Sequence, residues 1–493
     1  MPDPVVLAFE DRSYRRSELD AEVNGLAAAL QKSGVQAGDR VALMSSNRPE
    51  FVFALYAIWR AGAAVVLLSS SWKRAEVEHA LSLTRPTHAI GDQPLLGELM
   101  RMRSLDEPVP PHAEPVGQQP APDSDAVFVF SSGTTGMPKA VRHTHASFAA
   151  AVRHWGEALG LGRTDRLQIA TPPSHILGLL NITTVLDRGG FLRLHRRFDI
   201  DTLLRHIESD RITVEMAVAP IALAIASHPA LESFDLSSLR YIMWCATPVT
   251  PSVAETVTRR TGVPWLTAYG ASELPVLACN DVVGARLDTV GRAPAGVRLR
   301  VVSLDTGEPL PAGETGEIQA QSDSVMAEYL PASDTADAFA DGWYRTGDVG
   351  HLDEDGYLRI TDRAKEMIKV RGFQVAPAEV EGVLLGHPAV ADCAVFGIPD
   401  PVDGEAVVAA VATRSEVDAA ELLALVGDSL ARYKRPRDVI FVEEIPRLPS
   451  GKVLRRVLKE RHGCTSDRRT TTTARRGRRS GRRSGTRFGR GPG

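Results

Sequence analysis

Residues 126–139, "AVFVFSSGTTGMPK", join a short apolar run to a loop of small polar residues and glycine. The apolar run is rich in valine and phenylalanine, so it predicts a buried strand. In the loop, Gly133 and Gly136 allow backbone amides to approach an anion, and Lys139 adds a positive charge to the hydroxyl donors. The stretch therefore predicts a strand that leads into a phosphate-binding loop, and a plain surface turn is the alternative.

Two familiar phosphate-loop patterns do not fit this stretch. A Walker-type loop places its lysine directly after the second glycine, whereas here Met137 and Pro138 stand before Lys139. The GxGxxG pattern of dinucleotide-binding folds does not match either. Glycine spacing alone therefore does not assign the kind of phosphate that the loop binds.

Upstream of the loop, strand-like and helix-like segments alternate along the chain. "RVALMSS" (40–46) is followed by "PEFVFALYAIWRAGA" (49–63), and "AVVLLSS" (64–70) is followed by "WKRAEVEHALSLTRP" (72–86). This rhythm predicts an α/β fold in which helices cover mostly parallel sheets. The proline-rich segment 106–125, between these elements and the loop, predicts a surface connection.

The pattern changes toward the C-terminus, from about Asp337. Residues 341–363 contain two Asp-Gly pairs between short strand-like pieces, and the segments beyond mix helix and strand. We therefore predict a boundary near residues 362–365. A large N-terminal domain is expected over 1–362, and a smaller, mobile α+β domain over 363–463.

The composition is that of a globular protein, with 493 residues of which 43% are hydrophobic and 24% charged. No run of about 18 uncharged apolar residues occurs, and the N-terminus lacks the pattern of a secretory signal. We therefore expect a cytoplasmic protein without a transmembrane segment. The four cysteines are scattered singly, which favours neither a disulfide framework nor a zinc site, and the first three are expected to be buried.

The last thirty residues, 464–493, differ from the rest of the chain. They carry ten arginines and one acid, Asp467, for a net charge of +9. Because the whole chain carries −4, residues 1–463 carry −13. The segment has almost no apolar side chains to bury, so it predicts a disordered tail. A nucleic-acid-binding arm is the alternative, which the acidic remainder of the chain disfavours.

Five motifs, in order, resemble those of one enzyme family. "FSSGTTGMPKAVRHTH" (130–145) is followed by "YGASE" (269–273), "YRTGD" (344–348), "DRAKEMIKVRGFQVAPAEVE" (362–381) and "PRLPSGKVLRR" (446–456). Together they resemble the adenylate-forming enzymes, the superfamily of acyl-CoA synthetases, luciferases and peptide-synthetase adenylation domains. The fourth motif is most similar to that of coumarate:CoA ligases and related acyl-CoA ligases.

The resemblance implies an acid-thiol ligase that uses ATP and Mg²⁺. Enzymes of this family join a carboxylate to AMP with loss of pyrophosphate, and then pass the acyl group to a thiol. A carboxylate must approach the negative α-phosphate, so such a site needs cations and oriented donors rather than a protein nucleophile. The acceptor is CoA or the phosphopantetheine of an acyl carrier protein, and the sequence leaves this choice open.

By similarity, the loop and three later motifs bind the nucleotide. Lys139 and Thr134 are implied to act on the leaving phosphates. Tyr269 is implied to stack against adenine, and Glu273 to hold Mg²⁺, which prefers carboxylate oxygen. Asp348 is implied to accept both ribose hydroxyls. The other nucleotide-binding residues that the resemblance implies are Ser131, Ser132, Gly133, Thr135, Gly136, Ser272 and Arg363.

Three residues of the predicted C-terminal domain also match the family. Lys452 is implied to reach the carboxylate and the α-phosphate during adenylation. Lys365 matches the hinge about which the small domain rotates, and Gly372 matches a position beside the thiol channel. Because Lys452 and the glycine loop lie on different predicted domains, the resemblance implies that the domains close on each other during the reaction.

The resemblance also implies an acyl pocket lined by His175, Trp244, Cys245 and Ala268. Relatives commonly have small residues where this chain has Trp244 and Cys245, and "QGYG" where it has "TAYG" (267–270). Two added side chains crowd a planar ring, so we predict a flexible aliphatic, fatty-type acid of short to medium chain.

Two other functions stay open as alternatives. The first is an aromatic-acid:CoA ligase, because the fourth motif resembles coumarate:CoA ligases. The second is a non-catalytic nucleotide sensor, which the presence of Lys452 and Glu273 disfavours.

Overall fold

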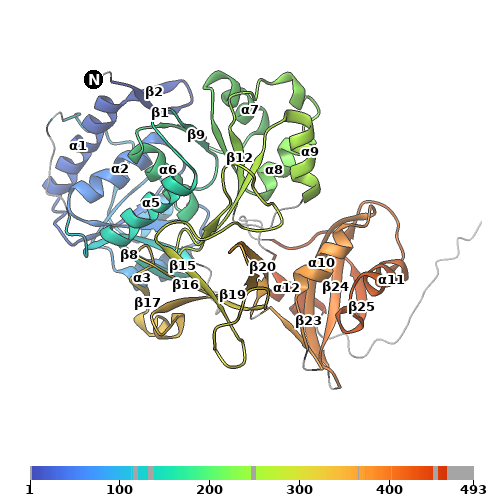
Figure 1. Ribbon diagram of the computed structural model, residues 1–493. Coiled ribbons are helices and arrows are strands. Elements are labelled where there is room, and N and C mark those ends of the chain that lie inside the picture. Colours follow the sequence, from blue (N-terminus) through green and yellow to red (C-terminus); the bar gives the residue numbers. More distant parts are fainter. Residues whose placement is uncertain are drawn as a thin grey trace, which may run out of the picture.

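The computed structural model describes residues 3–112, 114, 120–131, 138–245, 251–364, 366–371, 373–400, 402–447 and 453–462 (Figure 1). It confirms the predicted fold class. Helices cover two large, mostly parallel sheets in the N-terminal part, and a smaller mixed sheet with its own helices follows at the C-terminal end.

The first large sheet has seven strands in the order β17-β8-β7-β4-β3-β5-β6. β3, β4, β5, β6 and β7 run parallel, whereas β8 and β17 are antiparallel to their neighbours. The strands are β3 (Arg40–Met44), β4 (Ala64–Leu68), β5 (His88–Gly91), β6 (Met102–Ser104), β7 (Asp125–Ser131), β8 (Lys139–Thr144) and β17 (Glu328–Leu330). The helices between them are α2 (Pro49–Arg60), α3 (Arg74–Thr84), α4 (Pro94–Leu99) and α5 (His145–Ala158).

The second large sheet has eight strands in the order β14-β13-β12-β11-β9-β10-β1-β2. All neighbours are parallel except β2 and β14, which are antiparallel to β1 and β13. The strands are β1 (Val5–Phe9), β2 (Arg12–Arg15), β9 (Arg166–Ile169), β10 (Phe191–Leu194), β11 (Val214–Ala217), β12 (Tyr241–Trp244), β13 (Trp265–Tyr269) and β14 (Ala278–Cys279). The helices beside them are α1 (Arg16–Lys32), α6 (Ile176–Asp187), α7 (Ile200–Ser209), α8 (Ala219–Ser227), η1 (Leu231–Ser233) and α9 (Pro251–Thr261).

Apolar strands explain why these sheets are buried on both faces. β4 is the five-residue run AVVLL, and every residue of it is buried. Strands covered on both sides carry continuous apolar runs rather than an alternating pattern. One core cluster includes residues of both large sheets, such as Leu43 and Leu266. A second cluster lies between the eight-stranded sheet and α7, α8 and α9, with Leu203 and Val257 among its residues.

A third, antiparallel sheet continues the chain. It has the order β15-β16-β19-β18, and β20 pairs with β19. Its elements are β15 (Val297–Val302), β16 (Gly316–Ser322), η2 (Ala332–Asp334), η3 (Ala336–Ala338), β18 (Phe339–Ala340), β19 (Trp343–Leu352) and β20 (Leu358–Arg363). The two Asp-Gly pairs precede β19 and β20, where the sequence predicted turns.

The C-terminal sheet has the order β22-β21-β24-β23, and β25 pairs parallel to β24. Its apolar side chains form a cluster of their own with α10 and α11, and Figure 1 shows these elements grouped at one side of the molecule. The elements are β21 (Ile368–Val370), β22 (Phe373–Val375), α10 (Pro377–Leu385), β23 (Val390–Asp400), β24 (Gly404–Thr413), α11 (Ala419–Ser429), η4 (Arg432–Lys434), β25 (Asp438–Phe441) and α12 (Arg455–His462).

The predicted domain limits at 362/363 and 463 stay predictions. Sheet membership changes between β20, which pairs with β19, and β21, which pairs with β22 and β24. The tail 464–493 lies outside the described residues. Within the described ranges, no helix is long and apolar enough to span a membrane. Cys245, Cys279 and Cys393 are buried and unbonded to one another, as the sequence predicted.

Candidate active site

The two ends of the glycine loop face each other across an antiparallel strand pair. Ser131 ends β7 and pairs with Lys139, the first residue of β8. Because β7 runs parallel to β4 and β3, its carboxyl end lies at the same edge as theirs. Ligands of α/β folds bind at this edge of a parallel sheet. The predicted phosphate loop thus starts and ends where such a fold places a ligand.

Lys139 is held by two groups from one distant segment. Its Nζ lies 2.8 Å from Asp334 Oδ2 and 5.2 Å from the centre of the Tyr329 ring. Both partners come from β17 and η2, and β17 pairs with β8. A cation within about 6 Å of an aromatic face is attracted to it. The ammonium is therefore fixed at the end of the loop by a carboxylate and an aromatic ring.

Glu273 supplies a buried carboxylate to the site, with 7% of the residue exposed. Its Oε1 accepts a hydrogen bond of 2.7 Å from the Tyr329 hydroxyl. Among the residues that the structure describes, no group of three His, Cys, Asp or Glu side chains could hold a metal ion by itself. Mg²⁺ on a nucleotide takes one or two protein carboxylates plus phosphate oxygens, so this donor set fits that cation.

His143 joins β8 to the turn that carries Ser272 and Glu273. The ring is fully buried; its Nε2 lies 2.8 Å from the Ser272 carbonyl oxygen, and its Nδ1 lies 3.3 Å from the Ser147 hydroxyl. Burial lowers the pKa of His143 to about 4, so the ring is neutral near pH 7. A neutral ring that donates from Nε2 accepts at Nδ1, which matches a carbonyl on one side and a hydroxyl on the other.

Gly270 explains the shape of the same turn. A Cβ at this position would lie 2.1 Å from the Pro275 carbonyl oxygen. The turn doubles back so that the Ala271 N–H donates to the Leu274 carbonyl at 3.0 Å. A side chain at position 270 would therefore push apart the segment that holds Glu273.

Asp348 forms a second charged centre with Tyr269 and Arg363. Asp348 and Arg363 are paired across β19 and β20, and Arg363 Nε lies 2.9 Å from Asp348 Oδ1. The Tyr269 hydroxyl donates to Asp348 Oδ2. Burial and the Asp348 charge raise the pKa of Tyr269 well above its usual range, so the phenol stays a donor. The structure thus brings together three residues that the sequence placed at the adenosine.

The four predicted acyl-pocket residues do not share one environment. Cys245 and Ala268 belong to the core cluster between the large sheets. Trp244 belongs to the cluster under α8 and α9, where its ring centre lies 5.3 Å from that of Trp265. Successive residues of an extended chain face opposite sides, which separates Trp244 from Cys245. Ala268 pairs with Cys279 of β14, which places a second thiol beside it.

His175 begins α6 after the carboxyl end of β9. Its Nδ1 accepts a hydrogen bond of 3.3 Å from the Leu177 N–H, and the residue is exposed. The structure therefore gives His175 the contact of a helix cap. Its predicted part in the acyl pocket stays a prediction.

Eight predicted site residues lie outside the described ranges, and their roles stay predictions. They are Ser132, Gly133, Thr134, Thr135, Gly136, Lys365, Gly372 and Lys452.

Four neighbours of the site were missed by the sequence reasoning: His143, Cys279, Tyr329 and Asp334. Tyr329 and Asp334 reach Lys139 because β17 pairs with β8, which is far away in the sequence. A local sequence pattern does not predict such a long-range pairing. Only His143 carried a signal, because it lies within the first quoted motif between an expected strand and helix.

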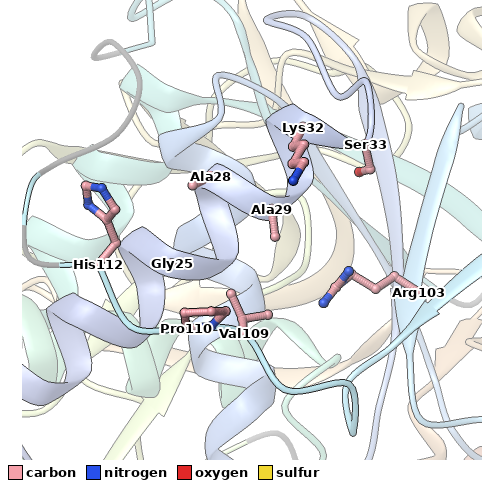
Figure 2. A pocket seen from close by; sticks show the side chains of 9 residues that line it. All are labelled: Gly25, Ala28, Ala29, Lys32, Ser33, Arg103, Val109, Pro110 and His112. Atoms are coloured by element: carbon pink, nitrogen blue, oxygen red, sulfur yellow. The ribbon is translucent and has the colours of Figure 1, made fainter.

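A groove of about 530 Å³ lies away from these charged groups. It runs between α1 and the segment from Arg103 to His112, with Lys32 at one side (Figure 2). At its floor, a Cβ on Gly25 would lie 2.4 Å from the Pro110 carbonyl oxygen, so the connection packs directly on the helix. The first part of the proline-rich connection is therefore docked against α1.

Comparison with known proteins matches two family models. "AMP-binding enzyme" covers residues 1–330, and "AMP-binding enzyme C-terminal domain" covers residues 379–452. A feruloyl-CoA synthase of an Amycolatopsis species is 35% identical over 91% of this chain and 94% of its own length. A long-chain-fatty-acid–CoA ligase of Mycobacterium tuberculosis is 32% identical over 91% of this chain and 93% of its own length.

Solved structures agree with these matches. ATP-bound MatB from Rhodopseudomonas palustris superposes with a TM-score of 0.88 at 27% identity, covering 94% of this chain and 96% of that one. The amide bond synthetase McbA from Marinactinospora thermotolerans gives 0.86 at 31% identity, covering 93% and 97%. Both family models match this chain, and the paired charges described above lie at the sheet edges. The chain therefore belongs to the AMP-binding, adenylate-forming enzymes and is similar to their CoA ligases.

Proposed function

We propose that this protein uses ATP to convert a carboxylic acid into an acyl-adenylate and then transfers the acyl group to the thiol of CoA. The observation that supports this proposal most strongly is the meeting of cations and buried carboxylates from four separate segments. Lys139 and Glu273 contact Tyr329, and the Asp348–Arg363 pair contacts Tyr269.

The first half-reaction forms one bond and breaks another. A carboxylate oxygen of the acid attacks the α-phosphorus, the bond between the α-phosphorus and the bridging oxygen breaks, and pyrophosphate leaves. Negative charge accumulates on the phosphates, so positioned cations lower the barrier. Lys139 and the hydroxyls of the glycine loop would bind the leaving phosphates. Bound Mg²⁺ would neutralise phosphate charge, with Glu273 as its protein ligand.

The nucleoside end would be held by the second centre. Asp348 is a carboxylate that already accepts a hydroxyl hydrogen bond from Tyr269, and ribose hydroxyls are donors of the same kind. Arg363 would approach the ribose from β20, the last strand before the C-terminal sheet. The Tyr269 ring would then lie beside the adenine, and Ser272 would contact phosphate.

The second half-reaction needs a different arrangement of the C-terminal part. The thiol sulfur attacks the acyl carbonyl carbon, the bond to the phosphate oxygen breaks, and AMP leaves with the thiol proton passing to solvent. We propose that Lys452 serves adenylation, that Lys365 is the hinge, and that Gly372 leaves room for the pantetheine arm. The domain limits 1–362 and 363–463 belong to this proposal.

The acid is proposed from the relatives and from the residues of the predicted acyl pocket. Relatives include enzymes named for feruloyl and for long-chain fatty acyl substrates. In this chain, Cys245 and Ala268 are buried on one face with Cys279 opposite Ala268. Because side chains fill this face where the resemblance to coumarate:CoA ligases implies glycine, we propose an aliphatic acid of short to medium chain. One excess methylene in an apolar pocket costs about 1 to 3 kcal/mol.

The acceptor is proposed to be CoA rather than a carrier protein. The relatives reported above are named as CoA synthase and CoA ligase, which supports this choice. The chain is also structurally similar to an amide bond synthetase, so a free amine is the alternative acceptor that the experiment must test.

Product analysis by mass spectrometry tests the proposal. The full chain is incubated with ATP, Mg²⁺ and one acid (butyrate, octanoate, palmitate, coumarate or ferulate), with CoA, a pantetheinylated carrier protein or a simple amine as acceptor. We expect acyl-CoA, AMP and pyrophosphate with an aliphatic acid and CoA. ADP and phosphate as products, or no acid-dependent product, would contradict the proposed reaction.

The same assay with Cys245→Gly/Ala268→Gly addresses the acid. The double variant should gain kcat/KM for coumarate and ferulate relative to octanoate by about tenfold or more. Ferulate or coumarate as the preferred acid of the unaltered chain would reverse the assignment to aliphatic acids.

A further inference from the structure

One aromatic side chain contacts both charged groups to which the proposed function assigns Mg²⁺ and the leaving phosphates. The Tyr329 hydroxyl lies 2.7 Å from Glu273 Oε1, and the centre of its ring lies 5.2 Å from Lys139 Nζ. Glu273 follows β13 and Lys139 begins β8, so the two groups belong to different sheets. Tyr329 is therefore a bridge between the two large sheets at the site.

The segment that carries Tyr329 is anchored on both sides of this bridge. The Met326 N–H donates to the Glu273 carbonyl at 2.7 Å, and the Tyr329 N–H donates to Thr335 Oγ1 at 2.9 Å. In the strand pair, Tyr329 lies opposite Val141 of β8. The backbone of residues 326–335 is thus fixed to the Glu273 turn and to the strand that begins with Lys139.

Tyr329 can act only as a hydrogen-bond donor to Glu273. An ionised carboxylate offers only acceptor oxygens, so the hydroxyl that lies 2.7 Å from Oε1 donates to it. Within the part of the chain that the structure describes, Glu273 Oε2 accepts no hydrogen bond. The Tyr329 hydroxyl therefore orients one carboxylate oxygen, and the second oxygen has no donor among the described residues and can meet a cation.

We propose that Tyr329 is a positioning residue for the metal–nucleotide complex, orienting Glu273 through its hydroxyl and Lys139 through its ring. This inference rests on the proposed function, because Glu273 and Lys139 meet Mg²⁺ and phosphates only in an ATP-using enzyme. Asp334 completes the arrangement, since its carboxylate holds the same ammonium at 2.8 Å.

Two substitutions separate the hydroxyl from the ring. Tyr329→Phe removes the donor to Glu273 and keeps the aromatic face beneath Lys139. Tyr329→Leu removes both. Tyr357→Phe is the matched control, because its hydroxyl also donates to a carboxylate, Asp281 Oδ2 at 3.1 Å, outside the site.

The experiment measures binding rather than turnover. The full chain and its variants are titrated calorimetrically with α,β-methylene-ATP, in which the scissile bond cannot break, across a range of Mg²⁺ concentrations. Loss of a partner that orients a metal ligand costs about 10- to 100-fold in metal affinity. Tyr329→Phe should therefore raise the half-saturating Mg²⁺ concentration about tenfold, with metal-free binding of the analogue unchanged.

The leucine variant should add a second effect. Loss of an aromatic face under a cation corresponds to about two- to fivefold. Tyr329→Leu should thus weaken metal-free binding by this factor as well as raise the Mg²⁺ requirement. Tyr357→Phe should match the unaltered chain in both measurements.

The outcomes distinguish this inference from the proposed function. The inference is overturned if Tyr329→Phe keeps its Mg²⁺ requirement within twofold of the unaltered chain, or if it weakens metal-free binding equally, as a merely structural residue would. If the unaltered chain binds the analogue but makes no acyl-adenylate, the proposed function fails. The half-saturating Mg²⁺ concentration of Tyr329→Phe still tests the inference in that case. Absence of any nucleotide binding by the unaltered chain contradicts both.

Discussion

At the scale of single residues, His143 fixes the Ser272 carbonyl and, through it, the turn that carries Glu273. His143→Leu would leave this buried carbonyl without its donor, which costs about 1–3 kcal/mol. His143→Gln keeps an amide donor near the position of Nε2. We expect the leucine variant to lose stability and about tenfold in adenylation, and the glutamine variant to retain most of both. Denaturant unfolding and acid-dependent adenylate formation measure the two effects, and equal impairment of both variants would contradict the hydrogen-bond account.

A buried chain of polar residues predicts a pH dependence of stability. Gln168 Nε2 lies 2.6 Å from Glu215 Oε2, and Gln168 Oε1 lies 2.8 Å from His195 Nε2. Burial raises the pKa of Glu215 from its usual 4.5 to about 8. The folded state therefore keeps a proton that the unfolded chain releases, so this residue's contribution to stability falls as pH rises from about 4.5 to 8.

Glu215→Gln removes this titration. Relative to the unaltered chain, the variant should gain a few kcal/mol of unfolding free energy between pH 5 and pH 8. Urea unfolding of both proteins at pH 5, 6.5 and 8 measures the difference. If the difference in unfolding free energy stays constant over this pH range, the pKa of Glu215 is not raised in the folded protein.

At the scale of elements, the turn after β13 depends on Gly270 having no side chain. Gly270→Ala would place a Cβ 2.1 Å from the Pro275 carbonyl, so the turn must open and displace Glu273. We expect adenylation to fall at least tenfold, with a lower unfolding temperature. Gly382→Ala in α10 is the control, because nothing lies within 4 Å of its added Cβ. That exposed helix position should gain about 0.5–1 kcal/mol, and adenylation should stay unchanged.

Elements with strong local patterns were predicted correctly from the sequence. The runs 40–46 and 64–70 contain β3 and β4, and 49–63 contains α2, because apolar strands and an amphipathic helix differ in period. β17 escaped prediction because its three residues are held by a long-range pairing with β8 rather than by their own composition. Tyr329 was not predicted as a site residue for the same reason, because it lies in β17.

Strand alternation separates the two neighbours Trp244 and Cys245. The family resemblance implies that Trp244 lines the acyl pocket with Cys245. In the structure the indole packs against Trp265 on the other face, and its part in the pocket stays a prediction. The motif resemblance gave the position of Trp244 in the chain, but only the pleat determines which face it occupies.

At the scale of the whole molecule, the described charged groups lie on the N-terminal sheets and β20, and the predicted catalytic Lys452 lies after the C-terminal sheet. The change of pattern along the chain predicted the boundary, and the family resemblance supplied the role of Lys452, which composition and periodicity alone do not reveal. Lys452→Ala should nearly abolish acyl-adenylate formation and spare thioester formation from a supplied acyl-adenylate, because its charge is needed only against the α-phosphate. Separate assays of the two half-reactions check this. Equal losses in both would argue against the proposal that the C-terminal domain takes different positions in the two half-reactions.

The central claim is that this chain activates an acid as an adenylate before any thiol takes part. Exchange of labelled pyrophosphate into ATP in the absence of CoA tests it most directly, because label returns to ATP only through a reversible adenylate. The account predicts exchange that requires both Mg²⁺ and an acid, proceeds without thiol, and falls at least tenfold in Glu273→Gln. Exchange that requires CoA, or no exchange with any aliphatic or aromatic acid while the protein binds ATP, would contradict it.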